Sequence, residues 1–77
     1  MSEAYIELRT IEKIRAFVNT VVLLEYEVDL LQGRYVIDAK SIMGIFSLDL
    51  LSPIQVIAHT DQAESFLKSV EPFLVKE

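Results

Sequence analysis

A change of hydrophobic period in the middle of the chain constrains the fold more strongly than any other feature of the sequence. Over residues 25–30, acidic and apolar residues alternate, which is typical of a strand with one covered face. Residues 34–38 return as a second strand. We place the turn between them at residues 32–33, where Gly33 can take the positive φ of a tight turn. The segment therefore predicts an antiparallel β-hairpin.

The segment before the hairpin has a strand pattern and then a helix pattern. Residues 4–8 alternate with period two and predict a first strand. From residue 10 to about residue 23, apolar residues recur at helical spacing, and Thr10 is placed to cap the helix N-terminus. The sequence therefore predicts a strand followed by an amphipathic helix.

The C-terminal third of the chain repeats this order. Residues 54–59 predict a fourth strand, which begins after Pro53 because proline suits a strand start. Thr60 or Asp61 is expected to cap a last helix, and Glu64 is spaced to complete a capping box with Asp61. Pro72 should end or kink that helix, since it has no N–H to donate.

The predicted order is strand, helix, strand, strand, helix, strand, helix. We expect an α+β domain over residues 1–77, a two-layer open-faced β-sandwich in which a four-stranded antiparallel sheet carries three helices on one face. The residues expected to face the core are Ala4, Ile6, Leu8, Ile11, Ile14, Phe17, Val18, Val21, Val22, Tyr26, Val28, Leu30, Tyr35, Ile37, Ala63, Phe66, Leu67 and Val70.

A short helix beginning at Ser41 has a pattern that core formation alone does not require. Ser41 stands between a predicted strand and the apolar run 42–48, which is the position of an N-cap. The apolar residues of this run cannot all face inward. The expected anchors are Ile45, Leu48 and, as an additional candidate, Met43, whereas Ile42 and Phe46 are expected nearer the surface.

Large apolar side chains beside an exposed cap favour a docking surface for another protein. We assign that surface to Lys40, Ile42, Met43 and Phe46. The alternative is an ordinary buried connecting helix.

Composition narrows the functional classes. The chain has 77 residues, no cysteine and a formal charge of −5, and its apolar residues are spread out rather than gathered in one long run. We therefore expect a cytoplasmic protein with one core, no membrane span and no disulfide. The negative charge disfavours nucleic acid as a partner. No metal-ligand spacing, phosphate-binding glycine loop or catalytic triad is present, so we expect neither an enzyme nor a cofactor.

The segment Ile37-Asp38-Ala39-Lys40-Ser41-Ile42-Met43-Gly44-Ile45-Phe46-Ser47-Leu48 resembles a V-N-x-K-S-I-M-G-x-M-S-L stretch of HPr. HPr is the histidine-containing phosphocarrier of the bacterial sugar phosphotransferase system. The resemblance implies a four-stranded antiparallel sheet in the spatial order 1-4-2-3. It also implies that Ser41 corresponds to the serine that HPr kinase phosphorylates.

The chain departs from this family at the phosphoacceptor histidine. The family carries that histidine at the start of the first helix, in a G-x-H-A-R-P pattern, and the corresponding position here is near Thr10. A phosphohistidine needs an imidazole nucleophile with donors nearby for the phosphoryl oxygens. His59 is predicted at the end of the fourth strand, in a different element, and is expected to be exposed and without a functional role.

The leading hypothesis is thus a degenerate HPr-like protein that cannot carry phosphate on histidine and acts as a regulatory or protein-binding module through the Ser41 helix. By family resemblance, its partner would be HPr kinase or a transcriptional regulator. One alternative is a sensor domain that binds a small molecule. The other is a structural module that self-associates, as a homodimer for example, through Tyr5, Val36 and Ile57 on the open sheet face.

Overall fold

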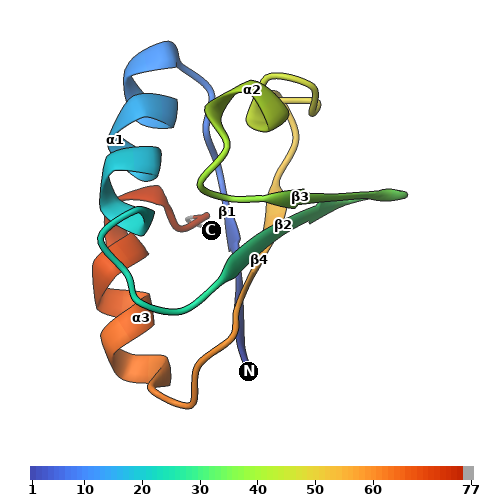
Figure 1. The fold of residues 1–77 in the computed structure, drawn as a ribbon. Helices are drawn as coiled ribbons and strands as arrows, with labels where there is room; N and C mark the ends of the chain where they lie inside the picture. The colour runs from blue at the N-terminus through green and yellow to red at the C-terminus, as the bar shows by residue number, and fades with distance from the viewer. Residues whose placement is uncertain (76–77) are drawn as a thin grey trace.

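The computed structural model describes residues 1–75 and has strands and helices in the predicted order (Figure 1). Four strands form one sheet, and the α-helices pack against one of its faces. The elements are β1 (Ser2–Ile6), α1 (Ile11–Val21), β2 (Val28–Gln32), β3 (Tyr35–Asp38), α2 (Ile42–Ile45), β4 (Ile54–Ala58), α3 (Ala63–Val70) and a 3₁₀ helix, η1 (Glu71–Phe73).

The sheet is antiparallel throughout and has the order β1-β4-β2-β3. The predicted α+β architecture and strand order are therefore confirmed. β4 lies between β1 and β2, with Val56 opposite Ala4 on one side and opposite Leu30 on the other. The sheet therefore joins the first strand of the chain to the central hairpin through its last strand.

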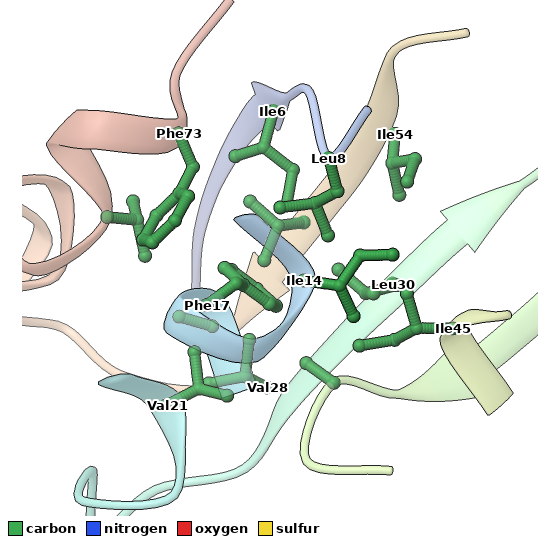
Figure 2. Close-up of a cluster of buried hydrophobic side chains, with 14 of the residues drawn as sticks. Ile6, Leu8, Ile14, Phe17, Val21, Val28, Leu30, Ile45, Ile54 and Phe73 are labelled. Carbon is green, nitrogen blue, oxygen red and sulfur yellow. The ribbon is translucent and has the colours of Figure 1, made fainter. Parts of the chain in front are cut away.

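One hydrophobic core lies between the sheet and the helices (Figure 2). α1 contributes Ile14, Phe17 and Val21, which recur at helical spacing and are buried. The Phe17 ring meets the Phe73 ring edge to face, with centroids 5.4 Å apart. In Figure 2, Ile14 of α1 and Ile45 of α2 point toward each other, so the core also holds α2 in place.

Several residues expected in the core are exposed because they lie at the ends of elements. Ile11 is the first residue of α1, and Val22 is its C-cap; both side chains are exposed. Ala63 is the first residue of α3 and is also exposed. Tyr35 is exposed because the hairpin extends beyond the helices (Figure 1). The helical and strand periods predicted correctly which face of each element is buried. They did not predict where along the element the layer that covers this face ends.

The hairpin turn is displaced by one residue from its predicted place. Gln32 pairs with Tyr35, so Gly33 and Arg34 form a two-residue loop. Gly33 has φ +58° and stands first in this loop, where a type II′ turn requires a positive φ. The first strand of the hairpin also begins later than residue 25, at Val28, and Tyr26 lies half-buried before it.

The start of α3 differs from the prediction as well. Its N-cap residue is Gln62, which makes no side-chain capping bond, so the capping box between Asp61 and Glu64 is not formed. The Thr60 hydroxyl instead accepts a hydrogen bond from the Gln62 N–H. Leu67 lies at the margin of the buried stripe and is partly exposed.

The chain after α3 returns to the outer edge of β1. Pro72 lies in η1 and ends the α-helix, as predicted. Leu74 bridges to Ile6 in antiparallel fashion. The Glu7 N–H donates to the Phe73 carbonyl, and the Val75 N–H donates to the Tyr5 carbonyl. These bonds cover an edge of the sheet that would otherwise be open.

Candidate functional site

The α2 N-terminus is built as the sequence predicts. The Ser41 hydroxyl accepts a hydrogen bond from the Gly44 N–H at 3.3 Å. The Ser41 N–H donates to the Asp38 carbonyl, and the Lys40 N–H donates to Asp38 Oδ1, so Asp38 fixes the turn into the helix. Ser41 itself is exposed. The side chain is thus both an N-cap and accessible at the surface.

An exposed apolar surface follows Ser41 on α2. The exposed fraction is 77% for Met43 and 45% for Phe46, whereas Ile45 is fully buried. Ile42 is half-buried against the core. Met43 is therefore not an anchor of the helix, because Ile42 and Ile45, three residues apart, take the inward face. We call the exposed Met43 and Phe46, together with the half-buried Ile42, the α2 surface.

Lys40 connects α2 to the end of α1. Its ammonium group donates a hydrogen bond to the Leu24 carbonyl at 3.0 Å, and the side chain is half-buried. Leu24 lies just after α1, where backbone carbonyls lack helical partners. Lys40 therefore has a structural contact that no local sequence pattern indicates, since the two residues are 16 positions apart.

Leu51 is a further exposed apolar residue that sequence reasoning missed. It lies between α2 and β4 and is 74% exposed. The sequence signal was the apolar pair of residues 50–51 between the Ser41 helix and the strand predicted over residues 54–59. Its partner in that pair, Leu50, packs against the core.

The start of α1 has no imidazole. Thr10 is its N-cap, and the Thr10 hydroxyl accepts a hydrogen bond from the Lys13 N–H at 3.1 Å. A shallow depression of about 280 Å³ adjoins this position. Two cations border it, but Arg9 lies 3.6 Å from Glu7, and the Lys13 ammonium donates to the Pro72 carbonyl. The groups around Thr10 thus include donors but no histidine.

His59 lies on the open face of the sheet, opposite the face that α1 covers. His59 Nε2 is 2.7 Å from Asp29 Oδ2, and both side chains are partly exposed. The His59 N–H also donates to the Glu27 carbonyl, which continues the pairing of β4 with the β2 segment. The prediction of an exposed histidine is correct, but the residue has an acidic partner that the sequence did not reveal. The sheet separates it from Thr10.

Within residues 1–75, no group of three or more His, Cys, Asp or Glu side chains is arranged to hold a metal ion. Nor is any helix in that part of the chain both long and apolar enough to cross a membrane.

No protein-family model and no curated protein matches the chain. The chain does match solved structures. A crystal structure described as HPr-C-His from Thermoanaerobacter tengcongensis has a TM-score of 0.76 and 26% sequence identity, and the match covers 94% of this chain and 89% of that one. The phosphocarrier protein HPr from Bacillus anthracis has a TM-score of 0.71 and 21% identity, with 96% and 94% covered.

These matches extend over nearly the whole of each chain and agree with the strand order and helix placement described above. The protein therefore has the HPr-like fold, and the resemblance to the HPr phosphocarrier family that its sequence indicated is confirmed at the level of the fold.

Proposed function

We propose that this protein is an HPr-like protein that does not carry phosphate on histidine and instead acts as a regulatory, protein-binding module through the α2 surface and Ser41. The observation that carries the proposal is that Ser41 at the α2 N-terminus is exposed and that Met43 and Phe46, two and five residues after it, are exposed as well. An accessible hydroxyl next to unpartnered apolar groups is the arrangement that a modifying enzyme or a reader protein needs.

The start of α1 supports the first half of this proposal. A phosphocarrier of this family uses a histidine there, and this chain has Thr10, whose hydroxyl is engaged in capping. His59 does not replace it, because it lies on the other face of the sheet with Asp29 as its partner. The HPr-like phosphocarriers are not enzymes, and we extend that assignment to this protein.

The second half of the proposal concerns Ser41. Phosphorylation would add a charge of roughly −1.5 to −2 beside the α2 surface. Because Met43 and Phe46 are exposed on the same short helix, the added charge would favour partners that offer an arginine and disfavour acidic ones. By family resemblance, HPr kinase and a transcriptional regulator are the proposed partners.

Two incubations test the proposal. With Enzyme I and phosphoenolpyruvate, the protein should gain no acid-labile phosphate. With HPr kinase and ATP, it should gain one phosphate by mass spectrometry, and the Ser41→Ala variant should gain none. An authentic HPr in each tube shows that the enzymes are active. The regulatory role of Ser41 is wrong if the authentic HPr is phosphorylated by the kinase and this protein is not.

A matched pair of variants tests the α2 surface. Phe46→Asp should lower kcat/KM for phosphorylation by HPr kinase, because it places a charge on the docking surface. Tyr5→Asp makes the same change at an exposed aromatic residue of β1 and should leave kcat/KM unchanged. Equal effects of the two variants would contradict docking through the α2 surface. Circular dichroism of both variants checks that they remain folded.

A further inference from the structure

β3 is the free edge of the sheet. It is the last strand in the order β1-β4-β2-β3, and no other strand of residues 1–75 pairs with its outer side. The opposite edge, β1, is covered by Leu74 and Val75. An uncovered edge strand offers its backbone N–H and C=O groups to another chain.

The register of the hairpin determines which backbone groups β3 offers. Gln32 and Tyr35 flank the two-residue loop and form a hydrogen-bonded pair. Hydrogen-bonded and non-hydrogen-bonded pairs alternate along an antiparallel ladder, so Leu31 and Val36 form a non-hydrogen-bonded pair and Leu30 and Ile37 the next hydrogen-bonded pair. The N–H and C=O of Val36 therefore point away from β2. The Val36 side chain is also 68% exposed.

The charged residues on either side of Val36 are complementary to those of a second, antiparallel copy. Val36 and Asp38 lie two positions apart in β3, so their side chains share the open face of the sheet. Arg34, the second residue of the loop, is exposed and directly precedes β3. If two copies of β3 pair antiparallel with Val36 opposite Val36, the register brings the exposed Arg34 at the start of each strand next to Asp38 at the end of the other. On the opposite face, Tyr35 then meets Ile37 of the second copy.

This charge pattern differs from that of a protected edge. Natural edge strands often carry charges that repel a second copy or resist pairing. Here, antiparallel self-pairing brings opposite charges together. Arg34 has no ion-pair partner within residues 1–75, and Asp38 uses Oδ1 for the Lys40 N–H, while no partner of its Oδ2 is found in the same residues. Both charged groups thus have capacity for a partner.

We propose that two copies of this protein associate through their β3 edges, with a twofold axis at Val36, so that the two sheets become continuous. The contact is isologous: Arg34 of one copy binds Asp38 of the other, and the exchange is repeated across the axis. The Asp38 carbonyl already accepts a hydrogen bond from the Ser41 N–H. The Asp38 N–H is therefore the group of this residue that bonds to the second copy. Association through β3 does not depend on the function proposed for Ser41.

The interface is small because β3 has four residues. Small interfaces form weak, reversible complexes, so the association belongs to the micromolar-to-millimolar range of concentration. Sedimentation velocity over that range should show the weight-average mass rising from 8.8 kDa toward twice that value. Amide exchange at Val36 should slow as concentration rises, since its N–H becomes hydrogen-bonded.

Substitutions that exchange the charges at positions 34 and 38 test the proposal most directly. Arg34→Glu places two acids opposite each other at both ends of the contact and should weaken association by about tenfold or more. Combining Arg34→Glu with Asp38→Arg restores opposite charges and should restore association. Arg15→Glu changes net charge equally at an exposed position of α1 and should have the smaller effect of added global charge.

Thermal melts followed by circular dichroism check the folding of each variant, because Asp38→Arg also removes the bond to the Lys40 N–H. The proposal is overturned if the wild-type protein remains monomeric at millimolar concentration. It is equally overturned if folded Arg34→Glu associates like the wild type, or if the folded double variant fails to regain association.

Discussion

The ring and the hydroxyl of Tyr26 have opposite effects on stability. Its hydroxyl is buried without a hydrogen-bond partner among residues 1–75, while its ring packs edge-on against Phe66 with centroids 6.5 Å apart. Desolvation by burial raises the pKa of the Tyr26 phenol above its ordinary value. The ring stabilises the fold, whereas the hydroxyl opposes it.

We therefore expect Tyr26→Phe to raise the free energy of unfolding by about 1 kcal/mol, because it removes an unpaired buried polar atom and keeps the ring. The gain should grow above pH 10. The folded state holds the phenol proton at pH values where the unfolded chain has lost it, so ionisation favours unfolding, and wild-type stability falls as pH rises through the raised pKa.

Urea denaturation at pH 7 and at alkaline pH measures both effects. Tyr5→Phe serves as the control, since Tyr5 is exposed and its hydroxyl loses little on removal. A Tyr26→Phe variant that is less stable than the wild type at pH 7 would mean that the hydroxyl has a favourable role in the native state.

At the scale of elements, the docking of α2 on β3 depends on a close approach. A Cβ added at Gly44 would clash with Cγ2 of Ile37, and it would also lie 3.4 Å from the Ser41 hydroxyl oxygen. Gly44 is needed here for space, because its φ is not positive. The same residue donates the N–H that Ser41 caps. One glycine thus sets both the distance of α2 from the sheet and the geometry of its N-terminus.

Gly44→Ala should therefore destabilise the protein by about 1–3 kcal/mol, the usual cost of overpacking. Helix propensity alone predicts the opposite sign, a gain of up to about 1 kcal/mol. Chemical denaturation of Gly44→Ala in the wild-type and Ile37→Ala backgrounds separates the two effects. The cost should largely disappear in the second background, where Cγ2 is absent. Equal costs in both would show that Ile37 is not the obstacle.

At the scale of the whole molecule, the two ends of the described chain are hydrogen-bonded to each other. The Val75 N–H donates to the Tyr5 carbonyl at 3.0 Å, and Leu74 bridges to Ile6. Phe73, just before them, packs on Phe17 of α1. The segment after α3 thus connects β1 to the helical layer, and it leaves β3 as the open edge of the sheet.

Val75→Pro should lower the free energy of unfolding by about 1 kcal/mol, because proline removes the N–H that bonds to Tyr5. Leu74 already has φ −63° and ψ 141°, which a following proline accepts. Val75→Ala keeps the N–H and is the control for the lost side chain. Equal denaturation midpoints for the two variants would show that this hydrogen bond contributes nothing measurable.

Local patterns in the sequence determined the kinds of elements and their order. Period-two and helical spacing predicted the first strand, the hairpin and the two longer helices, Thr10 and Ser41 were recognised as N-caps, with Ser41 marking the short helix, and Gly33 marked the turn. These features depend on residues within one or two turns of each other, so the sequence contains all of their causes. The strand order followed from the resemblance to HPr.

Only the tertiary structure decided which apolar residues are covered and which distant groups meet. Ile11 and Tyr35 fit the predicted inward face, yet they are exposed, because the covering layer ends before them. The bond from Lys40 to Leu24, the contact of His59 with Asp29 and the return of Val75 to β1 join positions far apart in the chain. Such contacts depend on the lengths and placement of whole elements, which local periodicity does not encode.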